Sequence, residues 1–139
     1  MQARADTATG SRPVTGRVAV LAAVIAASLA VASGLHLSGA VHGAAAPYDA
    51  GSAGIAEAVI GAVLAATAVA LARSGGRARR TGLLGFGFSI AGFGVGLSIT
   101  AQGGHWPDIA YHVAVLPLLI GCFVALVRAP RSSGGQGAT

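Results

Sequence analysis

Lysine and asparagine are absent from this 139-residue sequence, and charged residues of all kinds make up only 9% of it. A soluble domain has about 25%. With 54% hydrophobic residues and so few charges, the chain cannot cover a surface that is exposed to water. This composition excludes an ordinary soluble domain and predicts that lipid surrounds most of the protein. The length leaves room for one domain.

Cysteine occurs only once, as Cys122 within an apolar run, which excludes an internal disulfide and a CxxC metal motif. We expect this thiol to be a small lipid-facing or packing residue. The Ser74-Gly75-Gly76 stretch lacks the Lys-Ser/Thr of a phosphate-binding loop, and the sequence contains no HExxH, HxH or CxxCH pattern. No nucleophilic arrangement of Ser, His and Asp is visible, so we predict that the protein is not an enzyme.

Four apolar segments dominate the chain. Their bounds are residues 18–37, 55–72, 83–101 and 109–127. Each is close to the about 20 residues that a helix needs to cross a membrane. Strands are disfavoured because no segment alternates polar and apolar residues, and open sheets are unstable in lipid. We therefore predict an all-α fold, an integral membrane four-helix bundle over residues 17–128, with a polar tail at 1–16 and a disordered tail at 129–139.

The arginines predict the orientation. All nine basic residues are arginines, and they precede the first segment, separate the second from the third, or follow the fourth. They are Arg4, Arg12, Arg17, Arg73, Arg77, Arg79, Arg80, Arg128 and Arg131. The remaining loops, 38–54 and 102–108, contain none. The positive-inside rule then places both chain ends in the cytoplasm, and the bias toward Ala, Gly, Val and Arg points to a bacterial cytoplasmic membrane. Arginines dispersed in this way do not form a nucleic-acid-binding face, so the expected partner is the lipid bilayer.

The first segment has a second interpretation. Arg17, the apolar run after it and the small residues Ala30-Val31-Ala32 resemble a secretory signal peptide with its cleavage site. The apolar stretch is long for a signal peptide and continues to Leu37. We therefore favour an uncleaved membrane span.

Small residues line one face of the third segment. Gly85, Ser89, Gly92, Gly96 and Thr100 follow one another at steps of four, three, four and four residues. Helices in lipid associate by close approach of their backbones, so this stripe predicts a packing seam. We favour packing within the four-helix bundle over a face that forms a homo-oligomer.

Histidines and acidic residues gather on the side opposite the arginines. The residues that map there are His36, His42, His105, His112, Asp49, Glu57 and Asp108. Ionisable side chains inside a span are costly and usually face the bundle interior. His36, Glu57 and His112 lie inside the predicted spans, near their outer ends. The spacing of His105, Asp108 and His112 predicts one helix face, on which the Asp108 carboxylate orients His112.

The first hypothesis from this cluster is a transition-metal or haem site in the outer leaflet, with His36 and His112 as core ligands. The further candidate ligands are Glu57, His105, Asp108 and His42.

Three other interpretations stay open. Histidines that join helices or lie in solvated loops need no ligand. Glu57 in a span also suits a small proton-coupled transporter. Small multidrug transporters are four-helix chains with one membrane-embedded Glu, although theirs lies in the first span and Glu57 lies in the second, with few aromatic residues to line a cation pocket. The small-residue faces suit a structural or accessory subunit of a larger membrane complex.

Two short patterns add a resemblance. They are His42 and Pro47-Tyr48 after the first span, and Leu97-Ser98-Ile99-Thr100 at the end of the third span. Over about residues 36–127 the layout resembles small four-span membrane proteins of actinobacteria. That resemblance implies a multi-pass location in a bacterial membrane. Its members have no assigned activity, so it implies no function.

Overall fold

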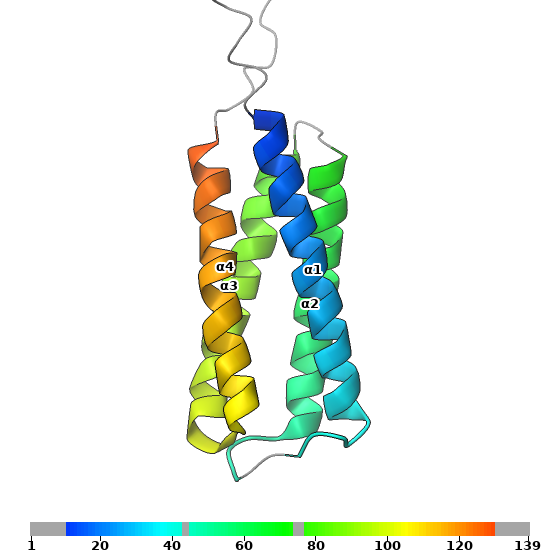
Figure 1. The fold of residues 1–139 in the computed structure, drawn as a ribbon, viewed down its shortest axis with the longest axis vertical. Helices are drawn as coiled ribbons and strands as arrows, with labels where there is room; N and C mark the ends of the chain where they lie inside the picture. Colours follow the sequence, from blue (N-terminus) through cyan, green and yellow to red (C-terminus); the bar gives the residue numbers. More distant parts are fainter. Residues whose placement is uncertain (1–10, 43–44, 74–76, 130–139) are drawn as a thin grey trace, which may run out of the picture.

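The computed structural model describes residues 11–42, 45–73 and 77–129, and these residues form four α-helices with no strand among them. The helices are α1 (Ser11–Leu37), α2 (Ala50–Ala72), α3 (Ala78–Gly103) and α4 (Trp106–Arg128). The predicted all-α fold with four helices is confirmed (Figure 1). Most of the two predicted tails, at residues 1–10 and 130–139, lies outside the described residues.

Each helix is longer than the apolar segment that predicted it. Residues 11–16, expected as tail, are the first turns of α1. α2 begins at Ala50 because the Asp49 carboxylate caps it, accepting a hydrogen bond of 2.7 Å from the backbone N–H of Ser52. Helical hydrogen bonds do not require apolar side chains, so the helices continue past the point where the sequence stops being apolar.

The helices form two hairpins, α1–α2 and α3–α4, which stand side by side (Figure 1). α1 packs most extensively on α2, α3 contacts both α2 and α4, and α1 contacts α4 least. The start of α1 and the end of α4 lie at one end of the bundle. The described residues of the α1–α2 loop, 38–42 and 45–49, and the α3–α4 connection lie at the other end, here named the loop end (Figure 1).

All four helices are long and apolar enough to cross a membrane. Large apolar side chains such as Val24, Leu84 and Val95 are exposed on the perimeter. Such a surface promotes aggregation in water, whereas it is the expected perimeter of a bundle in lipid. The arginines of the described residues lie at the end opposite the loop end, and the acidic residues lie near the loop end. The chain thus has the architecture of a multi-pass membrane protein.

The small-residue stripe of α3 faces the inside of the bundle. Gly85 lies directly against the Thr67 side chain of α2, so closely that an added Cβ would overlap it. Gly92 faces another α2 side chain, and Gly96 faces α4. Ser89 between them is fully buried and donates a hydrogen bond to the Gly85 carbonyl over 2.9 Å. The absence of side chains at these glycines lets α3 approach both of its neighbours.

Arg79 joins α3 to α4 at the end opposite the loop end. Its guanidinium donates two hydrogen bonds of 2.9 Å, to the carbonyls of Leu126 and Val127. These carbonyls belong to the last turn of α4, where no helical partner is available. A cation is also stabilising at the negative end of a helix. Arg79, which in the sequence analysis served only to predict the orientation, therefore also stabilises the end of α4.

The α1–α2 loop crosses the loop end and contacts the second hairpin. The Ala45 N–H donates a hydrogen bond of 3.0 Å to the carbonyl of Gly103, the last residue of α3. Gly103 lies so close to the Ala45 carbonyl that a side chain would not fit there. The loop also turns at Gly39, whose φ of 74° suits glycine. These contacts place Tyr48, near the end of the loop, over the interior of the bundle.

Candidate functional site

A buried, hydrogen-bonded His–Glu pair joins the first two helices near the loop end. His36 lies in the last turn of α1 and Glu57 lies in α2; they are 5% and 8% exposed. The Nδ1 atom of His36 is 2.7 Å from Oε2 of Glu57. Burial of such groups is costly unless they are paired. The pair therefore accounts for how both side chains are accommodated inside the bundle.

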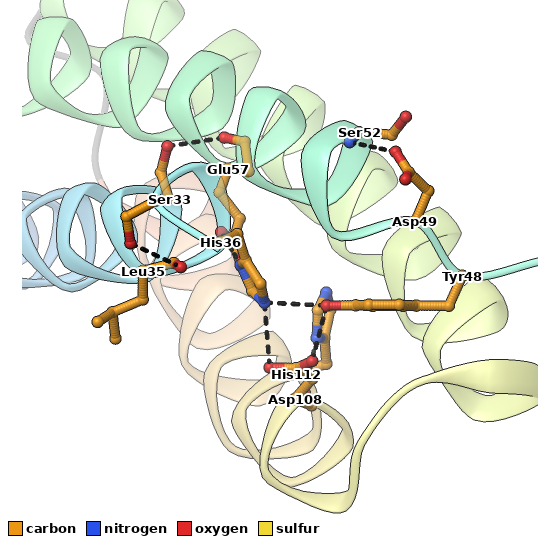
Figure 2. A network of polar contacts seen from close by, with 11 residues as sticks. Ser33, Leu35, His36, Tyr48, Asp49, Ser52, Glu57, Asp108 and His112 are labelled. Atoms are coloured by element: carbon orange, nitrogen blue, oxygen red, sulfur yellow. Dashed lines mark hydrogen bonds and ion pairs between the residues drawn. The ribbon is translucent and has the colours of Figure 1, made fainter. Parts of the chain in front are cut away.

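Tyr48 extends the pair toward the second hairpin. Its hydroxyl donates to Oδ2 of Asp108 over 2.9 Å and lies 2.9 Å from Nε2 of His36 (Figure 2). A hydroxyl has one proton, and here it goes to Asp108, so the His36 Nε2–H must be the donor to the Tyr48 oxygen. Burial, together with the hydrogen bond to Asp108, raises the pKa of the Tyr48 phenol, which therefore stays a donor.

Because Nε2 of His36 carries a proton, one further proton lies in the hydrogen bond between Nδ1 of His36 and Oε2 of Glu57. With Nε2 protonated, the short Nδ1–Oε2 contact holds either an imidazolium beside a carboxylate or a neutral imidazole beside a carboxylic acid. Asp108 completes the group, because its Oδ1 is 3.6 Å from Nε2 of His36. We name His36, Tyr48, Glu57 and Asp108 the relay cluster. It links α1, the α1–α2 loop, α2 and α4 (Figure 2).

His112 is held differently from the sequence expectation. The Asp108 carboxylate, expected to orient it, is engaged by Tyr48. The backbone carbonyl of Asp108 orients His112 instead, because Nδ1 lies 2.8 Å from that oxygen. A carbonyl only accepts hydrogen bonds, so Nδ1 carries a proton. The other ring nitrogen, Nε2, lies over Gly96, where an added Cβ would come within 2.6 Å of it.

The two remaining histidines lie outside the relay cluster. His42 in the α1–α2 loop and His105 at the N-cap of α4 are both exposed. No hydrogen bond or ion pair among the described residues joins either ring to His36, Glu57 or Asp108. The structure therefore brings together three of the six candidate ligands, and it adds Tyr48, which the sequence analysis named only as part of the Pro47-Tyr48 pattern.

The relay cluster does not have the geometry of a metal site. Across residues 11–42, 45–73 and 77–129, no group of three or more His, Cys, Asp or Glu side chains is placed to hold a metal ion. The reason is the direction of the donors. Glu57 lies at the Nδ1 edge of His36 and Asp108 at the Nε2 edge, so the two carboxylates face different nitrogens and do not converge on one point.

A cavity of about 720 Å³ adjoins the relay cluster. Side chains of α2, α3 and α4 line most of it, and Glu57 and His112 form part of its wall. Phe88 and Val95, which also line it, are exposed on the perimeter, so the cavity opens sideways between α2 and α3. Tyr48 reaches it from the loop end. The volume is in the range of small-molecule sites.

Further from the loop end than the relay cluster, a second polar contact joins the two hairpins. The hydroxyls of Ser28 in α1 and Tyr111 in α4 are 2.7 Å apart. Tyr111 also lines the cavity. Sequence spacing gave no indication of this contact, because the two residues lie on the first and last helices.

Comparison with known proteins gives no further assignment: no family model, curated protein or solved structure matches this chain. The geometry of the relay cluster and of the cavity is therefore the basis for a functional proposal.

Proposed function

We propose that this chain is a small proton-coupled transporter of the bacterial cytoplasmic membrane, in which the relay cluster exchanges a proton and the adjoining cavity holds the transported molecule. The observation that carries the proposal is the position of one imidazole between two carboxylates.

The charges of the relay cluster do not balance. Even a protonated His36 neutralises only one of the two carboxylates, Glu57 and Asp108, that it faces. An unbalanced charge in a membrane-spanning bundle is unfavourable, because solvation there is poor. The cluster relieves it by taking up one more proton or by binding a cation. A site that alternates between these two states exchanges protons.

Glu57 couples the proton to the cavity. It accepts or shares the proton of His36 and at the same time forms part of the cavity wall. A molecule that places positive charge beside Glu57 favours the ionised carboxylate, and protonation of Glu57 disfavours such a molecule. Binding of the proton and of the molecule are therefore linked and reciprocal.

The arginine pattern supports an orientation with both chain ends in the cytoplasm, which puts the loop end on the outer side. Protons then reach the relay cluster from outside, near Tyr48. The metal or haem hypothesis has less support, since the carboxylates face opposite edges of His36. A purely structural or accessory subunit would not require an unbalanced charge at the relay cluster.

The first test detects the exchanged proton. Infrared difference spectra of the purified protein in lipid, recorded as the pH is lowered, are expected to show the carbonyl band of a newly protonated carboxylic acid. Glu57→Gln should remove or shift that band. Asp49→Asn is the comparison variant: Asp49 lines the exposed edge of the cavity outside the relay cluster, so its loss should leave the Glu57 band in place, and asparagine still caps α2.

The second test detects coupling. Proteoliposomes with an imposed pH gradient and a trapped pH dye are challenged with cationic, neutral and anionic amphiphiles. We expect one class to move protons faster than in protein-free liposomes, and Glu57→Gln to abolish the difference. A carboxyl band that is identical in wild type and Glu57→Gln would refute proton exchange. A normal band without any coupled flux would favour the accessory-subunit hypothesis.

A further inference from the structure

The cavity beside the relay cluster has two chemically different parts. Toward the perimeter, apolar side chains such as Phe88, Val95 and Ile99 line it. Toward the loop end and the interior, its polar wall is formed by Tyr48, Asp49, Ser52, Glu57, Thr100, Tyr111 and His112. A ligand that fits both parts has an apolar body and one polar group. The chemistry of the polar wall decides which polar group that is.

The polar wall is acidic. Glu57 and Asp49 both line it, and no arginine does so among the described residues, whose arginines lie at the other end of the bundle. The carboxylate of Asp108 lies just behind Tyr48 and adds to the negative potential. Three carboxylates with few cationic neighbours disfavour an anionic group and favour a cation.

Aromatic rings form the adjoining surface. The ring of Phe93 is centred 5.1 Å from that of His112 and 6.1 Å from that of Tyr111. All three residues line the cavity. Phe93 is only 1% exposed and supports the partly exposed rings of Tyr111 and His112. An aromatic ring such as that of Tyr111 attracts a cation that has lost part of its hydration, which adds to the attraction of Glu57.

His112 adds a requirement for a hydrogen-bond donor. Its Nδ1–H is committed to the Asp108 carbonyl, so a neutral ring has an unprotonated Nε2. The structure gives this nitrogen no hydrogen-bond partner among the described residues, and it lies over Gly96, another lining residue. A bound group with an N–H satisfies Nε2, whereas a fully alkylated ammonium cannot.

We infer that the cavity binds amphiphiles with a protonated primary or secondary amine, that Glu57 attracts their charge, and that His112 Nε2 accepts a hydrogen bond from their N–H. This inference rests on the proposed function and deepens it, because it names the class of molecule that competes with the proton at Glu57. A primary or secondary ammonium can donate the hydrogen bond to His112 Nε2, and a quaternary ammonium cannot, so the site should distinguish the two classes.

The test measures equilibrium binding of four probes with one alkyl chain and different head groups. Dodecylammonium, dodecyltrimethylammonium, dodecanol and dodecanoate are titrated into nanodiscs of phosphatidylcholine that contain the full chain, with empty nanodiscs subtracted. We expect saturable binding of dodecylammonium, at least tenfold tighter than that of dodecanol or dodecanoate. Binding of the trimethyl probe should be weaker than that of dodecylammonium.

Two variants test the role of His112, each checked for folding by circular dichroism. His112→Phe keeps a ring beside Phe93 and removes both nitrogens; Gly96→Ala puts a methyl group against Nε2. Each should weaken dodecylammonium binding about tenfold, the effect of losing one hydrogen bond to a charged group, and leave trimethylammonium binding within about twofold. Gly94→Ala is the control in the same helix, since an added Cβ there contacts nothing.

The inference is overturned if the alcohol or the carboxylate binds as tightly as the amine, or if no probe binds saturably. It is also overturned if the folded variants bind dodecylammonium like wild type. Failure of the proposed function looks different. Tight, His112-dependent amine binding without proton flux in proteoliposomes would refute transport and leave this site in place. Proton flux driven by a neutral or anionic amphiphile, without amine binding, would refute the amine site alone.

Discussion

Replacement of Gly85 by alanine should separate α3 from α2 and destabilise the bundle. The new Cβ would overlap the hydroxyl of Thr67, and the Thr67 Cβ itself would be only 3.1 Å away. Rotating Thr67 does not relieve the overlap, because a β-branched side chain brings another atom toward the same position. Thr67 is almost fully buried, so it has no solvent-exposed space to move into.

The magnitude follows from two opposing effects. Overpacking of a well-packed interior costs about 1–3 kcal/mol in the free energy of unfolding. Exchange of glycine for alanine inside a helix contributes about 0.5–1 kcal/mol in the opposite direction. Gly94 lies in the same helix with open space at its Cβ position. Gly94→Ala should therefore show only the gain, and the two variants should differ by about 1–3 kcal/mol.

The assay uses the single native cysteine. Cys122 is buried, so its thiol reacts with a soluble maleimide only after the bundle opens. Labelling during titration with sodium dodecyl sulfate, alongside circular dichroism, gives the free energy of unfolding for each variant. Thr67→Ala combined with Gly85→Ala should recover about 1 kcal/mol or more relative to additivity. Equal stability of the two glycine variants, or strictly additive energies in the double variant, would refute the packing argument.

Three further predictions concern the loop end and the topology. Tyr48→Phe removes hydrogen bonds to two ionisable partners, the buried His36 and the partly buried Asp108, and should lower the free energy of unfolding by about 1.5–3 kcal/mol; an unchanged SDS-unfolding midpoint would contradict this. The pKa of Asp49 is lowered by the hydrogen bonds from Ser52, so its stabilising effect is present at neutral pH and lost as the pH falls below about 4. Asparagine at this position caps α2 without a charge, so Asp49→Asn should reduce the fall of the melting temperature at acidic pH. An unchanged fall would exclude Asp49 as its source. With the native cysteine replaced by serine, Ser38→Cys should react with an impermeant maleimide in intact cells and Ser132→Cys only after lysis; the reverse pattern would refute the orientation.

The helices were predictable because their signals are local. Apolar runs of about 20 residues and the clustering of arginine need no knowledge of tertiary structure. Helix ends were less predictable, since Asp49 and its partner Ser52 start α2 among residues that are not continuously apolar. The spacing of the small residues identified the face of α3 that carries them, because one face of a helix repeats at steps of three and four.

The site was only partly predictable because it depends on helix rotation and on a loop. Sequence placed His36, Glu57 and Asp108 on one side of the membrane but could not show that their side chains meet. Tyr48 was missed because loop residues have no periodicity that fixes their direction. Spacing alone predicted that the Asp108 carboxylate orients His112. In the structure that carboxylate accepts a hydrogen bond from Tyr48, and the His112 ring is hydrogen-bonded to the backbone carbonyl of Asp108.

The members of the relay cluster are far apart in the order of synthesis. His36 and Glu57 belong to the first hairpin, so their ion pair can form as soon as α2 leaves the insertion machinery. Tyr48 and Asp108 are separated by 60 residues, and the acceptor arrives only with α4. A nascent chain that stops after the first hairpin therefore lacks the carboxylate that accepts the hydrogen bond of the Tyr48 hydroxyl. Completion of this one hydrogen bond therefore marks a bundle in which both hairpins are in place.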